Sequence, residues 1–256
     1  MKELNRLVVK IGSSSLVKDG SVNKRFLAEL ARDISTLKEK NIDVCLVTSG
    51  AIATGVGKLG LPSKPIDIEG KQACAAIGQS YVIRQYEEVF DIYGLKCAQL
   101  LLTHDDFSRT TSSKHLQNTF NALFRYGVIP IVNENDATAI DEIKVGDNDT
   151  LGALTATLIG ANAYVIVSDV EGLYTANPKE KGAELISEVD EITDEIKALA
   201  VGHGVLGTGG MTTKLKAGEI VTERGLDMYI IHNSKIERLC SLLLNGERVG
   251  TKFRAK

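Results

Sequence analysis

Hydrophobic residues follow two alternating patterns along this chain. Short β-branched runs, such as Leu7 to Ile11 and Val44 to Val47, predict strands. Between them, apolar residues recur every three or four positions from Lys24 to about Lys40, and Asn23 is placed to cap the helix that this spacing predicts. Strand, helix and strand in this order form a βαβ unit with parallel strands.

The same alternation continues to the end of the chain. We expect further strands at residues 98–103, 128–132, 163–168, 227–232 and 250–253. We expect further helices at residues 67–93, 112–126, 151–159, 192–200 and 236–244, and one that ends near residue 224. Gly78 is a weak point in the longest helix, and Pro130 indicates a sheet edge or a strand start. No repeat or linker divides the chain, so residues 1–256 are predicted to form a single domain, a three-layer α/β/α sandwich with a mostly parallel sheet.

Small and polar residues follow several predicted strands at their carboxyl ends. Gly12-Ser13-Ser14-Ser15 follows the first strand, Thr48-Ser49-Gly50-Ala51 the second, and Asn133-Glu134-Asn135-Asp136 a later one. In open parallel sheets, ligands bind at this edge. Lys10 interrupts the first apolar run, and it indicates either a solvated strand edge or an anion held by the lysine and backbone N–H groups.

Two other segments carry candidate chemistry. Asp147, Asn148 and Asp149 stand before the apolar helix predicted at Leu151 to Ile159. Asp149 could simply cap that helix, but one cap leaves the other two side chains without a structural task, so we interpret them as a site for cations and polar ligands. The loop Gly207 to Lys214, with three glycines and three threonines, is either a flexible surface loop or a donor-rich loop that delivers a lysine to a helix.

Charge and motif content disfavour several classes of protein. The net charge of −3, without a basic block, argues against a nucleic-acid partner. No P-loop pattern is present, and two GxGxxG matches, at Gly55 to Gly60 and Gly202 to Gly207, lack the strand before and helix after that dinucleotide binding requires. The uncharged stretch after Asp149 is divided by Gly160-Ala161-Asn162, so we expect no membrane span.

The remaining signals favour a cytoplasmic protein. The chain begins without the apolar region of a signal peptide. The four cysteines form no CxxC pair and lie in apolar runs, as expected for buried, reduced thiols: Cys45, Cys74, Cys97 and Cys240. The four histidines have no metal-binding spacing and are treated as surface or core residues: His104, His115, His203 and His232.

Five segments together resemble the amino-acid kinase family, and the resemblance covers nearly the whole chain. They are Val9-Lys10-Ile11-Gly12-Ser13-Ser14, Val47-Thr48-Ser49-Gly50-Ala51-Ile52, Val132-Asn133-Glu134-Asn135-Asp136, Lys144-Val145-Gly146-Asp147-Asn148-Asp149 and Gly207-Thr208-Gly209-Gly210-Met211-Thr212-Thr213-Lys214. Many members carry a C-terminal PUA domain, whereas this chain ends soon after the predicted kinase fold, so we expect regulation and assembly that depend on that domain to differ.

The resemblance implies that ATP, with Mg²⁺, phosphorylates the γ-carboxylate of L-glutamate at the start of proline biosynthesis, with proline as an inhibitor and a homo-oligomer as the assembly. By motif, Lys10 and Lys214 would contact the transferred phosphoryl group, and Asp149 would orient both lysines. Ser49, Asp136 and Asn148 would hold glutamate. ATP would be held by Lys10, Ser168, Asp169, Thr208, Gly209, Gly210, Met211, Thr212, Thr213 and Lys214. No metal ligands are assigned.

The chemistry of this reaction agrees with the candidate residues. A carboxylate acceptor with a pKa of about 4.3 is already ionised at neutral pH, so the reaction needs no general base. Asp136 can pair with an α-ammonium, which an N-acetylated acceptor lacks. The alternatives are a family member acting on aspartate, acetylglutamate or a nucleotide, and a non-catalytic amino-acid or nucleotide sensor. A sensor would lack a lysine or acid, but Lys10, Asp149 and Lys214 are all present.

Overall fold

The structure is a computed structural model that describes residues 4–138, 148–201 and 210–256. Its elements in chain order are β1 (Arg6–Ile11), α1 (Ser13–Leu16), β2 (Val17–Lys18), β3 (Ser21–Val22), α2 (Lys24–Glu39), β4 (Asp43–Val47), α3 (Ala51–Leu59), α4 (Ile68–Ile92), β5 (Lys96–Leu102), α5 (His104–Ser108), α6 (Thr110–Arg125), β6 (Val128–Glu134), α7 (Asn148–Leu158), β7 (Ala163–Ser168), β8 (Glu188–Val189), α8 (Asp194–Val201), α9 (Met211–Thr222), β9 (Asp227–His232), the 3₁₀ helix η1 (Asn233–Arg238), α10 (Leu239–Asn245) and β10 (Thr251–Phe253).

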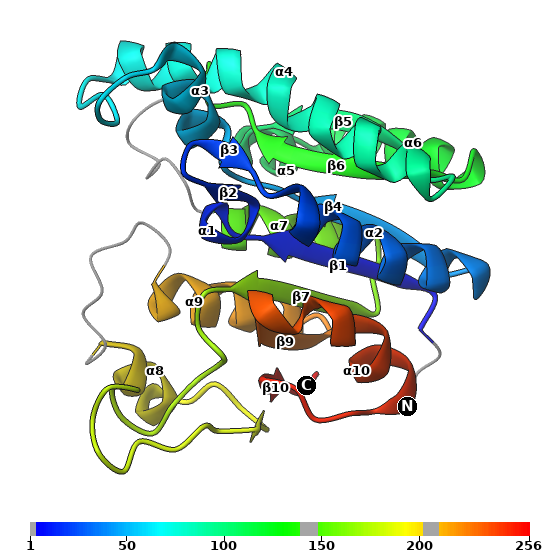
Figure 1. The fold of residues 1–256 in the computed structure, drawn as a ribbon. Coiled ribbons are helices and arrows are strands. Elements are labelled where there is room, and N and C mark those ends of the chain that lie inside the picture. The colour runs from blue at the N-terminus through cyan, green and yellow to red at the C-terminus, as the bar shows by residue number, and fades with distance from the viewer. Residues whose placement is uncertain (1–3, 139–147, 202–209) are drawn as a thin grey trace.

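The central sheet has eight strands in the order β5-β6-β4-β1-β7-β9-β10-β8. The six strands from β5 to β9 in this order pair in parallel, and β10 pairs antiparallel with β9, so the prediction of a mostly parallel sheet is confirmed. On one side of β1 lie β4, β6 and β5, and on the other side lie β7 and β9, which come later in the chain (Figure 1). The carboxyl end of β1 is therefore a switch point, where open α/β sheets bind ligands.

Helices cover both faces of this sheet, which confirms the three-layer prediction. Leu7, Val9 and Ile11 of β1 point into one hydrophobic core, which residues of α2, α4 and α10 complete. Val8 points into the opposite core, together with residues of α6, α7 and α9. Because side chains alternate along a strand, Lys10 lies on the same face as Val8, towards α7 and α9.

The structure differs from the sequence analysis at four places. The chain forms a hairpin, β2–β3, between the first strand and helix, around the turn residues Asp19 and Gly20. Pro130 does not mark a sheet edge, because β6 lies between β5 and β4, and the pairing with β4 begins only at Ile131. The last predicted helix begins instead as the 3₁₀ helix η1.

The fourth correction concerns α4, which runs without a break through Gly78. A Cβ atom at Gly78 would lie 1.8 Å from the backbone oxygen of Ala51, so this glycine allows α3 and α4 to pack closely rather than weakening the helix.

Several negative predictions also have an outcome. The first GxGxxG match occupies the last turns of α3 and its C-cap Gly60, so it does not form a dinucleotide-binding turn, whereas the second lies outside the described residues. Within the described residues, no helix is both long and apolar enough to cross a membrane. The four thiols are free, with Cys45 and Cys74 buried and Cys97 and Cys240 half-buried.

Candidate active site

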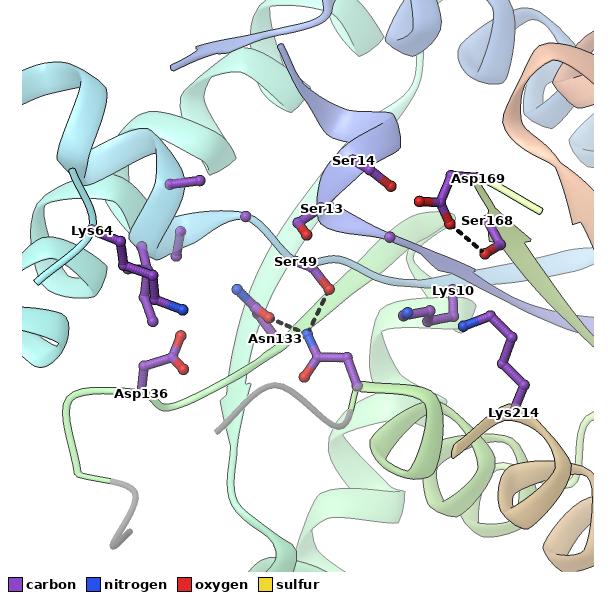
Figure 2. Close-up of a pocket in the computed structure, with 16 residues that line it drawn as sticks. Lys10, Ser13, Ser14, Ser49, Lys64, Asn133, Asp136, Ser168, Asp169 and Lys214 are labelled. Carbon is purple, nitrogen blue, oxygen red and sulfur yellow. Dashed lines mark hydrogen bonds between the residues drawn. The ribbon is translucent and has the colours of Figure 1, made fainter. Parts of the chain in front are cut away.

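A cavity of about 310 Å³ opens at the carboxyl ends of β1, β4, β6 and β7. The structure brings predicted site residues from distant parts of the sequence into its lining: Lys10, Ser49, Asp136, Asn148, Ser168, Asp169 and Lys214 (Figure 2). The cavity is also lined by Gly12, by Ser13 and Ser14 of α1, and by the first turn of α3. The prediction that polar strand ends gather at one edge of the sheet is confirmed for the described residues.

Two buried lysines share one carboxylate at the floor of the cavity. Lys10 Nζ lies 2.6 Å from Asp149 Oδ1, and Lys214 Nζ lies 3.1 Å from Asp149 Oδ2. Thr213 Oγ1 donates a hydrogen bond of 2.9 Å to the same Oδ2. Asp149 is 1% exposed and lies inside the first turn of α7, where its carboxylate faces the lysines, so the interpretation of Asp149 as no more than a helix cap is wrong.

The electrostatics of this triad favour the ionised form of Asp149. Burial by itself raises the pKa of Asp149, but the charges of Lys10 and Lys214, with their hydrogen bonds, outweigh burial and lower the pKa to about 2. Burial lowers the pKa of Lys214, and the neighbouring charge of Lys10 adds to this effect while Asp149 opposes it. Two ammonium groups and one carboxylate carry a net positive charge, which attracts an anion to the cavity.

Close packing fixes the position of α7 and hence of Asp149. Tyr164 of β7 donates a hydrogen bond from its hydroxyl to the backbone oxygen of Asp149 at 2.9 Å. Gly152, one turn further along α7, leaves room for that ring, since a Cβ atom there would lie 2.3 Å from the tyrosine oxygen. α9 carries Lys214 in its first turn and packs beside α7. Two separate helices thus present the acid and one lysine, and β1 presents the other.

Asn148 connects the ends of two strands on the other side of the cavity. Its Nδ2 donates to the backbone oxygen of Thr48, to Ser49 Oγ at 2.9 Å and to Asn133 Oδ1 at 2.8 Å. Figure 2 marks the bonds that reach Ser49 and Asn133 with dashed lines. Its Oδ1 is buried and has no hydrogen-bond partner within the described part of the chain. A buried acceptor without a partner is costly, so a donor group placed beside this oxygen would be stabilised.

The turn between β4 and α3 positions Ser49. Gly50 adopts a φ of 88°, in the left-handed region, and caps α3. The first turn of α3 then rests on Gly78 of α4 through the contact with Ala51 described above.

Asp136 lies at the end of the cavity that is farther from the lysine pair (Figure 2). Burial, with the negative charge of Glu134, raises the pKa of Asp136 to about 6, and Lys64 partly counteracts them. Lys64, between α3 and α4, lines the same cavity. Sequence reasoning missed Lys64, because nothing in its exposed, proline-flanked segment distinguishes it from other surface lysines.

Ser168 and Asp169 lie on the β7 side of the cavity, where Ser168 Oγ donates a 3.2 Å hydrogen bond to Asp169 Oδ1. Gly210 precedes α9, and Met211, Thr212 and Thr213 form its first turn with Lys214. Asp147, Thr208 and Gly209 lie outside the described residues. Within residues 4–138, 148–201 and 210–256, no group of three or more His, Cys, Asp or Glu side chains is arranged to hold a metal ion.

Known structures share this fold. The chain superposes on carbamate kinase from Giardia lamblia bound to AMP-PNP with a TM-score of 0.68 and 18% identity, covering all of both chains. For the product complex of isopentenyl phosphate kinase from T. acidophilum, the TM-score is 0.64 and the identity 17%, covering 98% of this chain and 100% of the other.

Sequence comparison gives closer relatives. The chain is 47% identical to glutamate 5-kinase from Clostridium acetobutylicum over 99% of this chain and 96% of the relative, and 46% identical to that from Clostridium tetani over 100% and 96%. It is 44% identical to glutamate 5-kinase from Desulfitobacterium hafniense over 99% of this chain and 69% of the relative. Residues 5–232 match the amino acid kinase family, and with this match and these identities the chain belongs to that family.

Proposed function

We propose that this chain is a cytoplasmic enzyme that transfers the γ-phosphoryl group of ATP to the γ-carboxylate of L-glutamate, giving L-glutamyl 5-phosphate and ADP in proline biosynthesis. The observation that carries the proposal is the pair of buried lysines that Asp149 holds at the floor of the cavity. The choice of glutamate as acceptor is supported by relatives named glutamate 5-kinase at 44% to 47% identity.

In the proposed step, a γ-carboxylate oxygen forms a bond to the γ-phosphorus of ATP while the bond from that phosphorus to the bridging oxygen breaks. The electron pair of the broken bond stays on ADP, and no proton is transferred. The barrier is electrostatic, because an anion approaches a polyanion. Lys10 and Lys214 stabilise the charge on the transferred group and the leaving oxygen, and Asp149 keeps both ammonium groups in place.

Glutamate binds at the β4 and β6 side of the cavity. Asp136 pairs with its α-ammonium, and Ser49 and Asn148 position the substrate, with the buried Asn148 Oδ1 as a further acceptor for the ammonium group. Such a site disfavours N-acetylated acceptors, because they have no α-ammonium.

ATP binds at Ser168 and Asp169 on the β7 side and at residues 210–214 at the start of α9, and Thr208 and Gly209 are proposed to contact it as well. Magnesium binds in proteins through one or two carboxylates and the substrate phosphates. Both oxygens of Asp149 face lysines, so Asp169 is the described carboxylate on the nucleotide side that fits such an ion. Bound there with the nucleotide, the ion would neutralise phosphate charge. We also propose that the enzyme works as a homo-oligomer, which sedimentation would test.

Trapping the acyl phosphate with hydroxylamine tests this function. Glutamate, aspartate and N-acetylglutamate are each supplied with ATP and magnesium, and glutamate is expected to give the highest turnover. Lys214→Ala should lower turnover by on the order of 10²-fold, as for loss of a donor to the developing charge, with glutamate binding largely kept. Faster turnover of aspartate or N-acetylglutamate, or near-normal turnover in the variant, would contradict the proposal.

A further inference from the structure

The end of the cavity that is farther from the lysine pair contains two more charges of opposite sign. Figure 2 shows the ammonium end of Lys64 and the carboxylate of Asp136 facing each other there. Both residues belong to the described part of the chain, and they form no direct ion pair with each other, so a ligand can bind between them. Asp136 is half-buried after β6, and Lys64 is exposed in the segment after α3.

Counting the charges of the proposed substrate shows which group lacks a partner. Glutamate has a γ-carboxylate, which meets the Lys10 and Lys214 side, and an α-ammonium, which meets Asp136. Its α-carboxylate remains. The lysines that line the cavity are Lys10, Lys64 and Lys214, and the first and last are engaged by Asp149. Lys64 is the lining lysine positioned beside Asp136.

The surroundings of Lys64 favour an anion at this position. Its side chain lies beside α3, since it lines a neighbouring groove together with Ala53, Val56 and Gly57. The cavity lining also includes Ala51 and Ile52, which belong to the first turn of α3. The first N–H groups of a helix have no acceptor within the helix, and they add positive potential there.

We propose that Lys64 binds the α-carboxylate of the acceptor, so that Lys64 and Asp136 together recognise the zwitterionic head group of a free α-amino acid. This inference rests on the proposed function and adds a specificity residue to it. A lysine is a flexible point charge, and an exposed one can follow the substrate into the cavity.

Two truncated acceptors separate the roles of these residues. 4-Aminobutyrate is glutamate without the α-carboxylate, and glutarate is glutamate without the α-ammonium, while both keep the reacting carboxylate. Lys64→Met should lower kcat/KM for glutamate by about 10- to 100-fold, because it removes a hydrogen bond to a charged group. The same variant should leave kcat/KM for 4-aminobutyrate unchanged. Asp136→Asn should lower kcat/KM for glutamate and leave that for glutarate unchanged.

The controls keep a folding defect apart from a lost contact. Lys64→Arg should retain part of the preference for glutamate over 4-aminobutyrate. Lys114→Met, which removes an exposed lysine of α6 that does not line the cavity, should behave as wild type. The KM for ATP and the thermal unfolding midpoint of Lys64→Met should match wild type. Where turnover of a truncated acceptor is too slow, its inhibition constant against glutamate replaces kcat/KM.

The outcomes are distinct for each hypothesis. Equal losses for glutamate and 4-aminobutyrate in Lys64→Met, or no loss for glutamate, would overturn the role of Lys64. Failure of the wild-type protein to phosphorylate glutamate would instead overturn the proposed function.

Discussion

Asp149→Asn tests whether one carboxylate supports two buried ammonium groups. The substitution keeps the shape of the side chain and removes its charge. Lys10 and Lys214, whose side chains are 9% and 5% exposed, would then face each other without a counter-ion. We expect the variant to lose both stability and phosphoryl transfer.

The expected loss of folding stability can be estimated from the pKa of Asp149 and from the cost of unpaired buried charges. The pKa of Asp149 is about 2 in the fold instead of 3.8, which corresponds to about 2 kcal/mol in favour of the ionised group. Because the folded pKa is the lower one, this contribution is complete above pH 3.8 and is lost as the pH falls towards 2. Leaving buried charges unpaired costs about 3 to 5 kcal/mol, so we expect the free energy of unfolding at pH 7 to fall by that amount.

Urea unfolding at pH 7 measures this change, and the hydroxylamine assay measures activity. Thr213→Val is the matched control, because it removes one hydrogen bond to Asp149 and should cost only about 1 kcal/mol. The triple variant Lys10→Met, Asp149→Leu, Lys214→Met should regain most of the lost stability but no activity, since apolar residues often replace a buried ionic group without loss. Wild-type stability in Asp149→Asn would refute this reasoning.

Three further predictions follow from the acceptor side of the cavity. Burial and Glu134 raise the pKa of Asp136 to about 6, so protonation below that pH should remove its charge. The kcat/KM for glutamate should therefore fall below pH 6, and Asp136→Asn should not show this decrease. Proline keeps the α-carboxylate and a cationic α-nitrogen, so it should raise the apparent KM for glutamate with little effect on kcat at saturation, and inhibition that saturating glutamate cannot relieve would indicate a separate site. Gly78→Ala should displace the first turn of α3 and cost about 1 to 3 kcal/mol of stability. It should raise the KM for glutamate more than the KM for ATP, whereas Ser80→Ala, on the exposed side of α4, should change neither KM value.

The sequence by itself determined the layers and the edge of the sheet at which the cavity opens. The strand from Ala163 to Ser168 and the helix that Asn23 caps were predicted correctly, because local apolar periodicity and capping chemistry decide such elements. Lys10 could be singled out because it interrupts an apolar run directly before Gly12 and three serines, but this pattern alone left both a solvated strand edge and an anion site open.

Only the tertiary structure decided which side chains meet. The pairing of Asp149 with both Lys10 and Lys214 joins residues 139 and 65 positions apart, and no local pattern encodes such a contact. Lys64 and Gly78 are clearer cases, since one is an ordinary surface lysine and the other an apparent helix breaker in the sequence. Their roles depend on where α3 and α4 pack, and that packing is set by contacts between distant residues rather than by the residues beside them.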